Sequence, residues 1–436
     1  MTSPSRQRWP RGLHSAAFHG SVEGTIALLS RGSIDIDQGD PNGCSPLMYA
    51  AQEGHSYVAG ILLSRGANVS IAADDGYTAL HFSARDGHVV VTVDLIKAGA
   101  DLEARDNRSW TPLHLATNCG HSEVMAALIE AGADVDCRSE NGSTPLLMAA
   151  ANGYLDVVIE LLRANASPLL TCSCENKSFF PLDLAAGIGH SEVVRELIQQ
   201  VGIEGCGGGS SGADALKGAA FSGWVDIMAT LTDAGVVDAG SALYMAAGCS
   251  QEVAVKFLLQ QRRRRGRTVD YVNTCNRLGE TPLLRSIRVA ISKEDVPCLI
   301  SPKVVRLLID AGANTLSAFR FASTAGGETV FHGTPLAFTS HCLRAKQVGG
   351  QEATEEQMGR LEAVRRLLLR VGAVHAVSWL WPRTPFLVGG AEGGSSRRAT
   401  KKTPASATPL TLMLPMLRHR RRGVLMAPLF RYSNHP

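Results

Sequence analysis

The feature that most constrains this chain of 436 residues is a short phrase that recurs every 33 residues. Each copy reads Ser or Thr, then Pro or Ala, then Leu, and a glycine follows nine residues after the first position. The copies begin at Ser45, Thr78, Thr111 and Thr144, and their glycines are Gly54, Gly87, Gly120 and Gly153. A fixed period of this length predicts similar structural units stacked in a line, each packed on its neighbours rather than on one central core.

The copy that begins at Thr111 predicts two short helices. Thr111 is placed to cap the first helix, and Pro112 suits the first turn because its missing N–H has no helical partner there. Gly120 ends this helix, since a left-handed C-cap favours glycine. A second helix is predicted from about Ser122, with apolar residues at helical spacing, and Gly132 ends it before an extended turn.

The 33-residue period, the Thr-Pro-Leu-His phrase at Thr111 and the Gly-His pairs at Gly54, Gly87 and Gly120 resemble the ankyrin repeat. This resemblance implies an all-α ankyrin-repeat solenoid, built from helix-turn-helix plus β-hairpin units. Along the chain we identify about ten repeats plus a degenerate half repeat.

The repeats divide the chain into segments of different regularity. The prediction is an N-terminal segment at 1–10, the repeat array at 11–378, the degenerate half repeat at 379–394, and a basic, disordered tail at 395–436. The array is near-consensus at 40–170, and it is degenerate or interrupted at 205–212, 262–268, 289–302 and 341–358. Because each repeat is stabilised by its neighbours, these interruptions are expected to be weak joints.

Charge is distributed unevenly, although the formal net charge is only +3. From Leu380 onward the chain has ten Lys or Arg residues against a single acid, Glu392, so the repeat array is acidic overall. An acidic array argues against nucleic acid as a partner.

The ten cysteines follow no disulfide-framework spacing, which fits reduced thiols in a cytoplasmic or nuclear protein. No run of about 18 apolar residues is present, so no membrane span is predicted. Arg6, Arg8 and Arg11 lack nearby acids, and this leaves a transit peptide as the alternative for the first residues.

Several motifs invite a chemical interpretation, and each has a structural alternative. His14, His81 and His114 occupy one repeat position without an acidic or nucleophilic partner, so we interpret them as hydrogen-bonding neighbouring hairpins. Cys172 and Cys174 suggest zinc, but no second ligand pair completes such a site, and ordinary thiols are the preferred interpretation. We therefore predict no catalytic, cofactor-binding or metal-binding residues, and no cofactor.

Glycine and arginine runs are ambiguous as well. The stretch Gly207–Gly212 lacks the Gly-Lys-Ser/Thr ending of a phosphate loop and is predicted to be a flexible connection. The arginine runs at 262–267 and 418–422 are interpreted first as solvated loop and tail charge. A nuclear-import signal and contact with RNA or an acidic partner remain alternatives.

The ankyrin resemblance implies that partners bind along hairpin tips and first helices, which line a concave groove. We expect Tyr77 and Trp110 to be exposed at one hairpin position of adjacent repeats, and aromatic residues and arginine dominate interface energetics. With the arginines around them they predict a partner segment that is both acidic and apolar. The predicted partner-binding residues are Asp74, Asp75, Tyr77, Arg85, Asp86, Arg105, Asn107, Arg108, Trp110, Asn118, Arg138, Glu140 and Asn141.

These features favour a non-enzymatic scaffold or adaptor that binds a protein through a preorganised groove. The alternative is a substrate-recognition subunit of a ubiquitin-ligase-like assembly, recruited through the apolar and basic segment Pro409–Tyr432. An enzyme is the third and least favoured class, because no catalytic signature is present.

Overall fold

The computed structural model describes residues 12–370, apart from 33, 175–176, 265, 267, 277–278, 289–300, 316–318, 323–328, 346, 349–350 and 353–354. The chain divides into two bodies, an N-terminal body (Met1–Asp238) and a C-terminal body (Ala239–Pro436). The predicted half repeat at 379–394 and the predicted tail at 395–436 lie outside the described residues.

The N-terminal body is a series of antiparallel helix pairs. Their first helices are α1 (Leu13–Phe18), α3 (Pro46–Gln52), α5 (Ala79–Asp86), α7 (Pro112–Cys119), α9 (Pro145–Asn152), α11 (Pro181–Ile188) and α13 (Gly208–Ser222). Their second helices are α2 (Val22–Leu29), α4 (Ser56–Ser64), α6 (Val89–Lys97), α8 (Ser122–Glu130), α10 (Leu155–Arg163), α12 (Ser191–Gly205) and α14 (Val225–Asp233). One antiparallel hairpin, β1 (Cys172–Cys174) and β2 (Lys177–Phe179), precedes α11.

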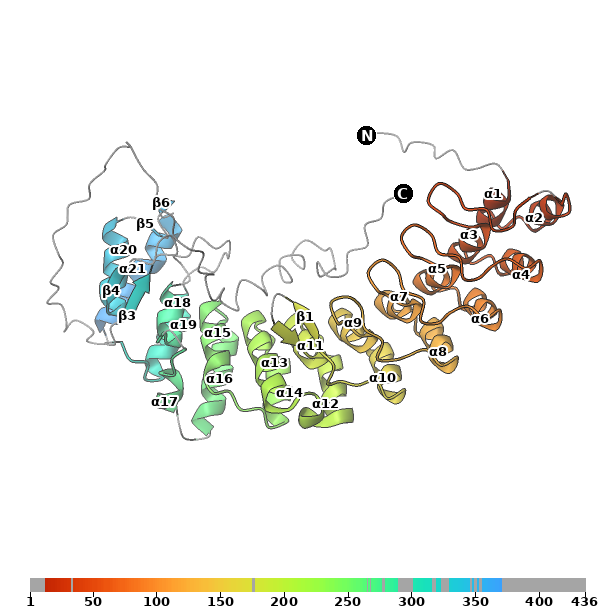
Figure 1. Cartoon of the computed structure of the whole chain (residues 1–436). Coiled ribbons are helices and arrows are strands. Elements are labelled where there is room, and N and C mark those ends of the chain that lie inside the picture. The colour runs from red at the N-terminus through yellow and green to blue at the C-terminus, as the bar shows by residue number, and fades with distance from the viewer. Residues whose placement is uncertain are drawn as a thin grey trace, which may run out of the picture. The chain divides into compact units, whose positions relative to one another are not determined.

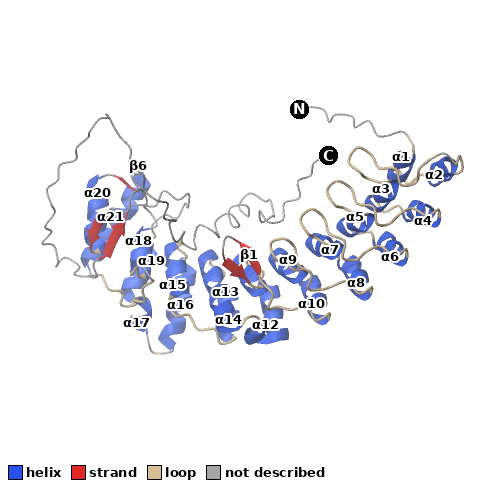
Figure 2. Ribbon diagram, in the orientation of Figure 1, coloured by secondary structure: helices blue, strands red, loops and turns tan. Residues whose placement is uncertain are grey.

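The pairs stack in two rows. First helices pack on first helices and second helices on second helices, so α5 lies between α3 and α7 while α6 lies between α4 and α8 (Figure 1). The loops that lead into α3, α5 and α7 extend beyond the row of first helices (Figure 2). This arrangement confirms the all-α repeat solenoid that the period predicts, within the N-terminal body.

The local sequence explains where each helix begins and ends. Thr78 caps α5, since its hydroxyl accepts a hydrogen bond from the backbone N–H of His81 at 3.4 Å. Gly120 ends α7 in the left-handed conformation, with φ of 77°, and α8 begins at Ser122 as predicted. Leu113 and Leu128 are fully buried between the two rows and form part of a continuous aliphatic core.

The glycine-rich stretch differs from its prediction as a flexible connection. The chain leaves helical geometry at Gly202, with φ of 72° and ψ of 166°, and α13 then begins at Gly208. Leu216 and Ala219 of α13 are buried, and this helix packs on α11. The packing of these later residues accounts for a helix that begins within glycines of low helix propensity.

The C-terminal body contains helices α15 (Ser241–Gly248), α16 (Glu252–Arg264), α17 (Thr268–Val272), α18 (Pro282–Arg288), α19 (Pro302–Asp310), α20 (Pro335–Ala345) and α21 (Glu355–Arg370). Two antiparallel hairpins are β3 (Phe319–Ala322) with β4 (Thr329–Gly333), and β5 (Gln347–Val348) with β6 (Gln351–Glu352). The predicted interruption at 341–358 is therefore partly regular, because α20 and α21 extend into it. Most of the interruption at 289–302 lies outside the described residues.

Among the helices that the structure describes, none has the length and apolar character needed to cross a membrane.

Candidate recognition surface

The loops that lead into α3, α5, α7 and α9 occupy the place of the predicted β-hairpins, and one ladder of backbone hydrogen bonds joins their tips. We call their residues the tip row, which consists of Asn42, Asp74, Asp75, Asn107, Arg108, Glu140 and Asn141. The backbone N–H groups of Asp74, Asn107 and Glu140 donate to the carbonyls of Asn42, Asp75 and Arg108 at 3.0, 3.0 and 3.3 Å. The ladder continues to Ser173, whose N–H donates to the carbonyl of Asn141 at 3.0 Å. Each tip is thereby held to the next, which makes the row a preorganised surface.

Tyr77 and Trp110 are buried, which corrects the prediction that they are exposed. Their side chains keep only 5% and 4% exposure. The ring of Tyr77 stacks on His81 with centroids 5.4 Å apart, and Trp110 stacks on His114 at 6.3 Å. The residue before each capping threonine therefore points into the space between hairpin and first helix, so these rings stabilise the repeat and leave the partner surface to other side chains.

His81 and His114 tie neighbouring repeats together, as predicted. Because the N–H of Thr78 donates to Nδ1 of His81 at 3.2 Å, the proton of this neutral ring is on Nε2, which donates to the carbonyl of Trp110 at 3.1 Å. His114 repeats the arrangement with Ser143, also at 3.1 Å. His14 does not, because its buried Nε2 has no hydrogen-bond partner among the described residues. The N-cap of its helix is Gly12, so the threonine hydroxyl that caps α5 is also absent here.

Burial sets the protonation of these groups at neutral pH. It lowers the pKa of His114 to about 4, and it also lowers the pKa of His81. It raises the pKa of Cys44 and of Cys137 to about 12. Neutral imidazoles and protonated thiols at these positions suit structure better than nucleophilic catalysis.

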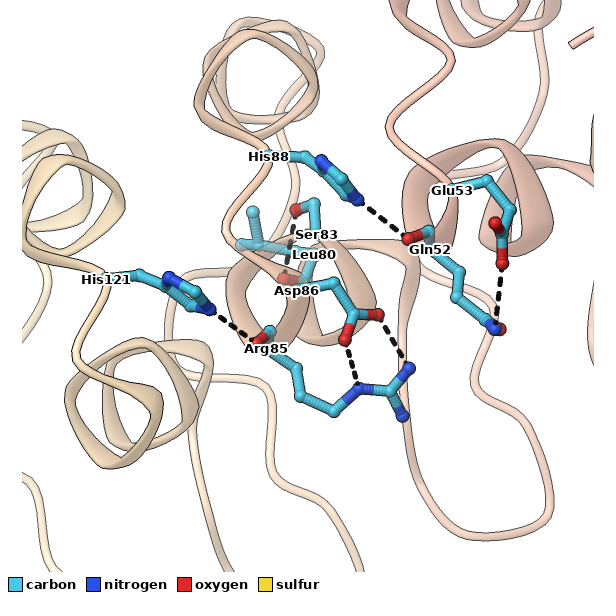
Figure 3. Close-up of polar contacts among 8 residues, drawn as sticks. All are labelled: Gln52, Glu53, Leu80, Ser83, Arg85, Asp86, His88 and His121. Carbon is cyan, nitrogen blue, oxygen red and sulfur yellow. Dashed lines mark hydrogen bonds and ion pairs between the residues drawn. The ribbon is translucent and has the colours of Figure 1, made fainter. Parts of the chain in front are cut away.

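The Gly-His pairs serve a second linking function that the sequence analysis missed. Nε2 of His88 donates to the carbonyl of Gln52 at 2.8 Å, and Nε2 of His121 donates to the carbonyl of Arg85 at 2.9 Å (Figure 3). Each bond satisfies a carbonyl near the end of the preceding first helix, which lacks a helical partner. His55 and His190 make the same bond to Phe18 and Ala151. The 33-residue spacing of the Gly-His pairs was the available signal for this role.

At Tyr154 the Gly-His pattern is interrupted, and an asparagine pair supplies the link instead. Nδ2 of Asn152 donates to the backbone carbonyl of Asn118 at 3.3 Å and to its side-chain oxygen at 3.2 Å. Asn118 is only 4% exposed, so it is part of this joint. This corrects its assignment as a residue free to contact a partner.

Half of the predicted basic patch is engaged within the protein. Arg85 forms a two-point ion pair with Asp86, with Nε–Oδ1 and Nη2–Oδ2 distances of 2.9 and 2.6 Å (Figure 3). Its guanidinium also lies over the ring of Phe82, 5.0 Å from the centroid. Arg105 donates from Nη1 to the carbonyl of Arg138 at 2.7 Å. These contacts hold two of the four predicted arginines in fixed positions.

The predicted residues therefore fall into three groups. Those with exposed side chains are Asp74, Asp75, Arg105, Asn107, Arg108, Arg138 and Glu140. Arg85, Asp86 and Asn141 are half-buried, and Tyr77, Trp110 and Asn118 are buried. Within the described part of the chain, the side chains of Asp74, Arg138 and Glu140 make no hydrogen bond or ion pair, so their identity is not required by the fold.

The structure also bears on the possible metal site and on the first arginine run. No group of three His, Cys, Asp or Glu side chains that could hold a metal ion occurs among the described residues. In the first arginine run, Arg262, Arg263 and Arg264 belong to the last turn of α16 and not to a loop, while Arg263 and Arg264 are exposed as predicted. Residues 265 and 267 lie outside the described part of the chain. The guanidinium of Arg262 lies 5.1 Å from the centroid of the Tyr271 ring. Basic residues at a helix C-terminus also interact favourably with its dipole.

The fold defines a stacked-repeat protein whose loop tips are joined by backbone hydrogen bonds. A family model for ankyrin repeats matches three times, over residues 13–106, 67–139 and 91–172. Residues 13–172 are thus ankyrin repeats, and they run from α1 to the start of β1.

One similar protein is "Protein phosphatase 1 regulatory subunit 27" of Mus musculus, which is 39% identical over 64 residues. The match spans 15% of this chain and 41% of the mouse protein, so each is matched over less than half of its length. Together with the repeats, this similarity supports a role in protein interactions. Neither comparison supports the ubiquitin-ligase alternative, and the segment Pro409–Tyr432 lies outside the described residues.

Proposed function

We propose that this protein is a non-enzymatic adaptor that binds a protein partner along the tip row of the N-terminal body. The observation that carries the proposal is the combination of a hydrogen-bonded backbone ladder with exposed side chains that the fold does not use. Asp74 and Glu140 of the tip row, and Arg138 two residues before Glu140, are such side chains. Because the backbone of the tip row is already fixed, the adaptor loses little conformational entropy when a partner binds there.

The chemistry of the tip row indicates a polar partner surface. Tyr77 and Trp110 are buried, so the apolar half of the predicted acidic and apolar segment has no counterpart in the row. The exposed charges are of both signs, with Asp74, Asp75 and Glu140 against Arg108. We therefore expect a partner segment that carries both acidic and basic residues, at the low to moderate affinity typical of polar interfaces.

The test is affinity capture from cell lysate with the full chain, read by mass spectrometry. The variant Asp74→Lys/Arg138→Glu/Glu140→Lys reverses two exposed charges of the tip row and that of the neighbouring Arg138. The matched control, Lys97→Glu/Glu130→Lys/Asp233→Lys, makes the same net change at the exposed last residues of α6, α8 and α14. Circular dichroism should show that both variants are folded.

The proposal expects proteins that wild type and control capture to be lost from the tip variant. Capture of the same proteins by all three chains would contradict it, and so would equal loss from both variants.

The catalytic subunit of protein phosphatase 1 is the first purified protein to test, because the mouse relative is by name a regulatory subunit of protein phosphatase 1. From the scattered cysteines we further propose a cytoplasmic or nuclear location, which fluorescence microscopy of the tagged chain would test.

A further inference from the structure

A second surface stands out at the N-terminal turns of the second helices. An acidic residue occupies this turn in α2, α8, α10, α12 and α14, where it interacts favourably with the positive end of the helix dipole. These residues are Glu23, Glu123, Asp156, Glu192 and Asp226. In α4 and α6 the first turn has no acid, and the corresponding residues are Tyr57 and Val90. Two adjacent repeats therefore lack a stabilising charge that the other second helices of the N-terminal body have.

The replacements are large, apolar and exposed. Tyr57 keeps 82% of its side chain exposed and Val90 keeps 62%, although the core around them is closely packed. The helices α4 and α6 pack side by side, and packed helices have axes about 8–10 Å apart. Val22, one residue before Glu23 in the first turn of α2, is 36% exposed and adds an apolar side chain on the helix that packs on α4. Single exposed apolar residues are common, but a run across three neighbouring helices is a mark of an interaction site.

The rim of this apolar surface is negative. Glu23 and Glu123 lie at the same helical position on either side of Tyr57 and Val90, and both are exposed. Glu53, at the end of α3, is a third exposed acid in these turns. Arg85, a basic residue in the last turn of α5, is already neutralised by Asp86 through two hydrogen bonds.

We propose that Val22, Tyr57 and Val90, here named the turn patch, bind a partner segment whose apolar side chains are flanked by Lys or Arg. The apolar residues would cover the three exposed side chains of the turn patch, and the flanking cations would meet Glu23, Glu53 and Glu123. A second copy of this chain fits less well, because a two-fold contact would place these acidic rims against each other. The surface is small, so the contact is transient and salt-sensitive.

The experiment selects peptides from a random 16-residue library displayed on phage against the immobilised full chain. The enriched peptides are synthesised, and their binding is measured by fluorescence anisotropy. The test variant is Tyr57→Glu/Val90→Glu, which installs the residue type that other repeats carry and so should fold. The matched control is Val253→Glu, which changes a 66% exposed valine in the first turn of α16, in the other body.

The expected result is enrichment of peptides with apolar residues flanked by basic ones. Their Kd should rise by at least about tenfold in the Tyr57→Glu/Val90→Glu variant and stay within about twofold in the control. The variant Glu23→Gln/Glu53→Gln/Glu123→Gln should weaken binding and flatten its dependence on salt. The proposal is overturned if no peptide is enriched, if the enriched peptides lack basic flanks, or if the Tyr57→Glu/Val90→Glu variant binds them as wild type does.

Discussion

At the residue scale, the histidines show how one side chain joins two repeats. His81 and His114 each accept from the backbone of their own helix cap and donate to the carbonyl that precedes the next cap. This requires the neutral ring, because Nδ1 must remain an acceptor. These histidines resemble catalytic bases in the sequence, but in the structure they are held as neutral rings that hydrogen-bond one repeat to the next.

This protonation state makes stability depend on pH. Burial lowers the pKa of His114 from 6.5 to about 4 in the folded protein, so between these values the unfolded chain binds more protons. Stability is then complete above pH 6.5 and falls as the pH decreases towards 4, with His114 contributing up to about 3 kcal/mol. Urea unfolding at pH 5 and at pH 7.5, followed by circular dichroism, measures the difference. In the variant His114→Gln, the difference in unfolding free energy between the two pH values should be smaller than in wild type. An unchanged difference would contradict a lowered pKa of His114 as its source.

Residue burial also explains what the sequence could and could not predict. The caps at Thr78 and Gly120 follow from local backbone chemistry, and both are confirmed. The burial of Tyr77 and Trp110 was not predictable in the same way, because their stacking partners, the imidazoles of His81 and His114, are also fixed by carbonyls 29 residues further along the chain. Asn118 was misjudged for a related reason, since its partner Asn152 lies in the next repeat.

At the element scale, the joint between consecutive pairs is a glycine covered by an aromatic or imidazole ring. An added Cβ at Gly87 would lie 2.7 Å from the ring of His121, whereas at Gly99 nothing lies within 4 Å. Both glycines have φ of 83°, so their backbone requirement is the same. A substitution at Gly99 therefore measures only the strain of a left-handed residue, whereas the same substitution at Gly87 adds the loss of the contact with His121.

We predict that Gly99→Ala costs about 1–2 kcal/mol, the usual strain of a left-handed alanine. Gly87→Ala should cost about 1 kcal/mol more, because the His121 ring must move and its bond to the carbonyl of Arg85 is lost. Urea unfolding of both variants measures these values. Equal costs would show that the His121 contact contributes nothing to the joint.

At the scale of the whole molecule, stability in a stacked array comes from neighbouring pairs, so distant pairs matter little to one another. The matched ankyrin repeats, the tip row and the turn patch all belong to the N-terminal body. The sequence predicted this part well because its period is regular from 40 to 170. It predicted the later part less well, because helices such as α13 and α20 extend through stretches where composition alone suggests an interruption.

A fragment of residues 1–238 tests this organisation, since it keeps every neighbour of α1–α12 and ends after α14. We expect it to fold with a cooperative urea transition that coincides with one transition of the full chain. The shorter fragment 1–223 lacks α14 and leaves the buried residues of α13 uncovered, so its midpoint should be lower. An unfolded 1–238 fragment would mean that the N-terminal body depends on residues beyond 238.

If the fragment folds as expected, it should bind the partners of the tip row and the peptides of the turn patch, because both surfaces are built entirely from its residues.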